Sequence, residues 1–105
     1  MKLKDSLKIG GHDVRVLFPY SFQETADLNG QQNPETKVIR VAGKSNSGVK
    51  FPDSFVKVVL IHEVLHEINT QSGKFIFPDD EYTEGRIDAL SEALYQVLHD
   101  NRLRF

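Results

Sequence analysis

The chain has 105 residues, the length of a single domain (1–105), and its 39% hydrophobic and 27% charged residues are typical of a soluble folded protein. The 13 basic and 15 acidic residues give a formal net charge of −2, so no basic surface predicts binding to nucleic acid or to an anionic membrane. No apolar run approaches the roughly 18 residues of a membrane span, and no apolar segment follows the charged start, so we expect a cytoplasmic protein. Cysteine is absent, which excludes thiolate ligands, so any metal must bind to nitrogen and oxygen.

The first half of the chain predicts β-strands. Apolar and polar residues alternate over 7–9 and 14–18 on either side of Gly10-Gly11, which is the pattern of a hairpin. Residues 19–35 contain several turn-forming residues, and 37–41 then reads as a third strand. We therefore expect a small antiparallel sheet at the N-terminal end.

The second half predicts two long helices. The first covers about 53–70, where Gly and Pro are absent between 53 and 72 and apolar residues occur at helical spacing. The last helix covers about 80–101 and repeats apolar residues every three to four positions. The expected fold class is therefore α+β, with the antiparallel sheet packed on both helices.

The most informative segment is His62-Glu63-Val64-Leu65-His66, an H-E-x-x-H pattern inside the first helix. Four residues turn a helix by about 400°, so the two imidazoles lie about 40° apart and one turn along, and both can reach one ion. Glu63 lies about 100° around the helix from His62, beside the pair, where its carboxylate can accept a proton from water at the metal. The competing interpretation, a pair of core histidines, gives no role to Glu63. The pattern therefore favours a metal site on His62 and His66.

A catalytic zinc site has three protein ligands, and the third must here be His, Asp or Glu. The metzincin extension is missing, because Asn69 and Ser72 stand where its Gly and third His would be. His12 and His99 are possible donors but belong to no pattern.

The last helix offers Glu84, Asp88 and Glu92, which are spaced four apart and so share one edge. A solvated acidic face explains such spacing often, and it is the interpretation we give to Glu92. A helical wheel puts Glu84 about 40° closer than Asp88 to the apolar face. Glu84-x-x-x-Asp88 also matches the gluzincin arrangement, in which a Glu binds zinc and an Asp one turn later orients a ligand histidine. Both Glu84 and Asp88 therefore remain candidates for the third ligand.

Taken together, the H-E-x-x-H motif and residues 94–101 (LYQVLHDN) make the chain resemble small zincin-like metallopeptidases of phages and mobile elements, related in pattern to the ImmA/IrrE group. The likeness covers about 35–101. It implies a minimal zincin-like fold, zinc as the cofactor with His62, His66 and Asp88 as ligands, and Glu63 as the general base. In that family the third ligand is more often Glu, and the shorter Asp88 keeps Glu84 as the alternative. The resemblance also implies that the strand at 36–41 lies near the site and pairs with an extended substrate.

The first functional hypothesis is therefore a zinc hydrolase that cleaves peptide bonds in a peptide or protein substrate, with Tyr82 or Tyr95 as candidate donors to the oxyanion. The second hypothesis is a non-catalytic, zinc-stabilised module that binds a protein partner such as a repressor. Its support is the small size of the chain, which leaves little wall for a substrate cleft. A structural site has no use for a carboxylate directly after its first ligand, so Glu63 favours the enzyme.

Overall fold

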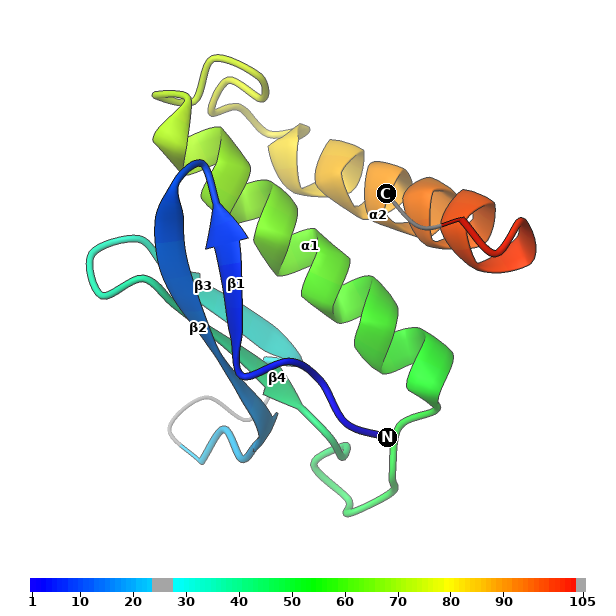
Figure 1. Ribbon diagram of the computed structural model, residues 1–105. Coiled ribbons are helices and arrows are strands. Elements are labelled where there is room, and N and C mark those ends of the chain that lie inside the picture. Colours follow the sequence, from blue (N-terminus) through cyan, green and yellow to red (C-terminus); the bar gives the residue numbers. More distant parts are fainter. Residues whose placement is uncertain (24–27, 104–105) are drawn as a thin grey trace.

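Four short strands come first along the chain and two long helices follow (Figure 1). This is a computed structural model, and it describes residues 1–23 and 28–103. The strands are β1 (Ser6–Ile9), β2 (His12–Tyr20), β3 (Gly30–Asn33) and β4 (Val38–Ala42), and the helices are α1 (Asp53–Gln71) and α2 (Thr83–Asp100). The α+β class is confirmed, and both helices lie within three residues of their predicted bounds.

The predicted hairpin is formed by β1 and β2, which pair antiparallel from Ser6↔Arg15 to Ile9↔His12. Gly10 and Gly11 connect the strands with φ of 57° and 83°. Two consecutive positive φ values are what a type I′ hairpin turn requires, and glycine adopts them without a steric penalty. The Gly-Gly signal in the sequence therefore has a direct backbone cause.

The sheet has the order β1-β2-β4-β3 and is mixed. Its outer pairs are antiparallel, as predicted, but β2 and β4 are parallel. The reason is β3, a strand that the sequence did not predict. It takes the sheet edge and reverses the chain, so β4 returns between β3 and β2 in the direction of β2.

Helix α1 lies between the sheet and α2 (Figure 1). It packs against β1, β3 and β4 on one side and against α2 on the other, while α2 has no contacts with the described strands. Only one helix therefore covers the sheet, where we expected two. The core beneath α1 contains buried aliphatic side chains of the sheet and of the first turn of α1, namely Ile9, Val14, Ile39, Val41 and Val56.

Where the two helices meet, α2 buries one apolar and one polar side chain. Ile87 and Ser91 of α2 are both fully buried, and the Ser91 hydroxyl donates to the carbonyl oxygen of Ile87 at 2.7 Å. A small side chain such as Ser91 lets the helices approach closely without leaving a polar atom unsatisfied. Neither helix of the described chain is long and apolar enough to span a membrane.

Candidate metal centre

Helix α1 presents His62 and His66 on one face, as the spacing predicted. Their Nε2 atoms lie 3.1 Å apart, and the side chains are 12% and 26% exposed. Both imidazoles therefore point at a common position that solvent can still reach.

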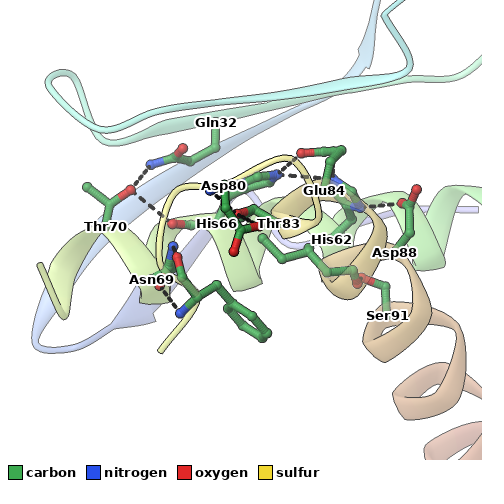
Figure 2. A network of polar contacts seen from close by, with 12 residues as sticks. Gln32, His62, His66, Asn69, Thr70, Asp80, Thr83, Glu84, Asp88 and Ser91 are labelled. Atoms are coloured by element: carbon green, nitrogen blue, oxygen red, sulfur yellow. Dashed lines mark hydrogen bonds and ion pairs between the residues drawn. The ribbon is translucent and has the colours of Figure 1, made fainter. Parts of the chain in front are cut away.

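Helix α2 adds two carboxylates to this pair (Figure 2). Glu84 places Oε1 2.5 Å from Nε2 of His62 and Oε2 3.1 Å from Nε2 of His66. Asp88 lies one turn further along α2, and its Oδ1 is 2.7 Å from Nδ1 of His62. Glu84 thus faces the two nitrogens that converge, whereas Asp88 faces the opposite nitrogen of His62.

The protonation of the imidazoles follows from these partners. A carboxylate at Nδ1 of His62 holds a hydrogen on that atom and leaves the lone pair of a neutral ring on Nε2. For His66, burial lowers the pKa below its ordinary value, although the Glu84 carboxylate opposes this shift. Neutral imidazoles are the form that binds metals, so the lowered pKa of His66 favours the form in which its Nε2 is a donor.

His62, His66 and Glu84 can therefore hold a metal ion. One donor atom from each lies within 4.8 Å of the other two. Asp88 was the third ligand that the resemblance implied, and Glu84 was the alternative. The geometry favours Glu84 in the donor group and gives Asp88 the contact to His62 that the gluzincin arrangement predicts.

Glu63 is the most buried of the chemically active side chains at the site, with 7% exposure. Burial raises its pKa to about 7. The nearby His62 opposes the shift, while Glu84 and Asp88 add to it. A carboxyl group with a pKa near neutrality can both accept and return a proton at neutral pH. Its position beside the histidine pair agrees with the sequence prediction.

The edge strand β3 comes close to Glu63. At Gly30 a Cβ atom would lie 2.6 Å from Cγ1 of Val59 and 3.0 Å from Oε2 of Glu63. A larger residue would force the Val59 and Glu63 side chains to move, so the close approach of the strand favours glycine at this position.

A cleft of about 600 Å³ opens in front of these residues. It is bounded by the start of β3, by α1 and by α2. Its lining combines the donor group and Glu63 with an apolar wall that includes Phe55, Val58, Val59 and Ala89. The cleft therefore has room for a side chain beside the metal position.

Several residues considered from the sequence lie outside the donor group. Glu92 lines the cleft but lies eight residues after Glu84, about 12 Å along the helix. Tyr95 and His99 stack on each other at 5.1 Å between ring centroids, in the last turns of α2. His12 is the first residue of β2, and Tyr82 directly precedes α2.

The strand at 36–41 does not have the free edge that we expected. It corresponds to β4, which has hydrogen-bonded neighbours on both sides, β2 and β3. Among the described strands, β1 and β3 form the two edges of the sheet and both lie against α1, and the edge strand that approaches Glu63 is β3. Its sequence, Gly-Gln-Gln-Asn, carries no apolar alternation, so within this segment the signal for it was its place before the β4 strand and a turn.

Comparison with known proteins gives no relative for this chain: no family model matches it, and neither do the curated proteins or the solved structures that were searched. The geometry of the His62, Glu63, His66, Glu84 and Asp88 side chains is therefore the basis for a functional assignment.

Proposed function

We propose that this protein is a zinc-dependent peptidase. The observation that carries the proposal is one constellation: two imidazoles and the Glu84 carboxylate converge beside a buried Glu63 with a pKa of about 7. A solely structural metal site would not need a tuned proton acceptor next to its donors.

Zinc fits the donor set. Two imidazole nitrogens and one carboxylate oxygen form a known type of catalytic zinc site that keeps its fourth position open. Tetrahedral bonds of about 2.0–2.1 Å separate neighbouring donors by about 3.3 Å. The Nε2 atoms of His62 and His66 lie 3.1 Å apart, and Nε2 of His66 lies 3.1 Å from Oε2 of Glu84, both close to this separation. The contact of 2.5 Å between Nε2 of His62 and Oε1 of Glu84 is shorter and would have to open when the ion binds. When bound, zinc would polarise the scissile carbonyl and acidify water.

Each neighbouring side chain has a role in this reaction. Glu63 accepts the proton of the attacking water and returns it to the leaving amine. Asp88 holds His62 in the tautomer that presents Nε2, which also raises the basicity of that ligand. The apolar wall of the cleft receives a side chain next to the scissile bond.

Strand β3 is the element to which we assign substrate binding. Its outer edge has no strand partner among residues 1–23 and 28–103, and it lies against α1 at Gly30 and Glu63. An extended peptide that pairs with this edge would gain main-chain hydrogen bonds and run past the donor group.

The test compares wild type with Glu63→Gln, which keeps the size of the side chain but cannot accept a proton. Metal analysis of both proteins should give one zinc per chain. Incubation with a peptide library, followed by mapping of new termini, should show cleavage that falls by about 100-fold or more in Glu63→Gln.

Glu81→Gln is the matched control, because it makes the same substitution at an exposed turn residue that lies outside the cleft lining. We expect it to cleave within a few-fold of wild type. Equal cleavage by wild type and Glu63→Gln would refute the role of Glu63. If both bind zinc and one protein partner, and neither cleaves a peptide, the non-catalytic module is the correct function.

A further inference from the structure

Strand β3 is not held in place by apolar burial. Its four residues are Gly30, Gln31, Gln32 and Asn33, and none of them is fully buried. Edge strands without apolar side chains are weakly specified in register and position. Something else must therefore fix β3 against α1.

A single carboxylate performs this role. Glu67 of α1 is completely buried. Its Oε1 accepts a hydrogen bond from Nε2 of Gln32 at 2.9 Å, and its Oε2 accepts from Nζ of Lys37 and from Nε2 of Gln71, both at 2.7 Å. The donors include the Lys37 ammonium, so the carboxylate is held in an ion pair as well as by two amides. A buried charge with this many partners is a rigid connection.

The two donors from the sheet lie at different points of the β3–β4 hairpin. Gln32 is on β3, and its side-chain amide also donates to Oγ1 of Thr70 at 3.3 Å (Figure 2). Lys37 directly precedes β4 and has a positive φ of 56°. Glu67 therefore fixes the hairpin at β3 and again beyond its turn.

The same contacts determine how β3 lies relative to Glu63. The backbone of Gln32 lies near the Glu63 carboxyl group, while its side chain is held by Glu67 one helical turn further along α1. At the other end of β3, Gly30 touches Glu63 and Val59. A shift of β3 would therefore change the separation between the sheet edge and the proton acceptor.

We propose that Glu67 is a positioning residue that holds the edge of β3 at the distance from Glu63 at which a peptide can pair with the strand and meet the donor group. This inference rests on the proposed peptidase function. It assigns a role to a buried ionic group that neither binds the metal nor touches the reacting atoms.

The test uses two probes on the zinc-loaded protein. Acetohydroxamate binds through the metal alone, whereas N-acetyl-alanyl-leucine hydroxamate also offers a short peptide main chain to β3. Glu67→Gln removes the charge and sets an amide against the Lys37 ammonium. We expect zinc affinity and acetohydroxamate affinity to stay within about three-fold of wild type. The affinity for the peptidyl hydroxamate should fall by at least ten-fold.

Gln32→Ala is the second variant. It removes only the donor on the strand and leaves Lys37 and Gln71 on the Glu67 carboxylate, so it is the variant to use if Glu67→Gln does not fold. It should show the same selective loss, and Glu81→Gln, on an exposed loop residue, should show none.

An equal loss of both hydroxamates, or no loss of either, would overturn the inference. A wild type that binds the peptidyl probe no more tightly than acetohydroxamate would also overturn it, while zinc content and the Glu63→Gln comparison still test the peptidase itself. Absence of zinc from the wild type would instead refute the proposed function directly.

Discussion

The raised pKa of Glu63 predicts that the site destabilises the metal-free protein at neutral pH. Its carboxyl group ionises near pH 4.5 in the unfolded chain and at about 7 in the folded protein, mainly because of burial. The folded state therefore binds this proton more tightly. The resulting stabilisation is complete below pH 4.5 and is lost as the pH rises to 7. The difference of 2.5 pH units corresponds to about 3 kcal/mol at 1.36 kcal/mol per unit.

The replacement Glu63→Gln imitates the protonated group at every pH, so it should escape this loss. Urea unfolding in the presence of a chelator should find the two proteins within about 1 kcal/mol of each other at pH 5. At pH 8 the variant should be more stable by about 3 kcal/mol. Glu81→Gln, which changes an exposed carboxylate, should follow wild type at both pH values. A stability difference that does not grow between pH 5 and pH 8 would refute the assignment of the shift to Glu63.

Three further outcomes follow from the geometry. Asp88→Ala should weaken zinc binding by about 10- to 100-fold, as does the loss of a side chain that orients a ligand, and Glu84→Ala should weaken zinc binding more. Competition with a zinc chelator measures both affinities, and the reverse order would make Asp88 the ligand. Gly30→Ala should destabilise the fold by about 1–3 kcal/mol in urea unfolding and slow turnover, because its Cβ would collide with the Val59 and Glu63 side chains. An unchanged free energy of unfolding together with unchanged turnover would contradict the close approach. Ile39→Ala, at a fully buried core position, should cost about 2–5 kcal/mol of stability and leave the zinc affinity of the folded protein unchanged; a large loss of zinc would show that core and site are coupled.

The parts of the fold that were predictable have strong local causes. The Gly10-Gly11 turn requires positive φ values that glycine readily adopts, and α1 runs through 19 residues without Gly or Pro. The H-E-x-x-H spacing also determines the placement of both histidines, because a helix repeats every 3.6 residues. For these features the sequence and the geometry are related by local rules alone.

Strand β3 was not predictable from local sequence patterns. Its Gly-Gln-Gln-Asn sequence has neither β-branched residues nor apolar alternation, and the side-chain contact of Gln32 is made to Glu67, which is distant in sequence. One signal was present in α1: Glu63 and Glu67 are spaced four apart and continue the face that begins with Val56 and Val59. When polar side chains continue a row of apolar side chains that faces a sheet, they indicate buried hydrogen-bond partners on that sheet, and here such a partner lies on β3.

The choice between Glu84 and Asp88 depended on how α2 is set against α1, which helical periodicity does not determine. The connection between the helices is fixed by Asn69, whose side-chain amide donates to the carbonyl oxygen of Phe77 at 2.9 Å and accepts from its N–H at 2.8 Å. Thr83 donates to the carbonyl oxygen of Pro78 at 2.6 Å and accepts from the N–H of Asp80 at 3.0 Å. These contacts set where α2 begins, and a shift of a single turn would exchange the two carboxylates.

The two buried glutamates of α1 explain how so small a domain can combine stability with the proposed chemistry. Glu63 and Glu67 lie one turn apart on the same face, yet the pKa of Glu63 is raised and that of Glu67 is lowered. Burial acts on both in the same direction, so the difference comes from the donors. Three side chains donate to Glu67, whereas the donor that acts on Glu63 is the backbone of Gln32 and two carboxylates lie nearby. The fully satisfied group can stabilise the β3 edge, and the poorly satisfied one is left free to exchange a proton.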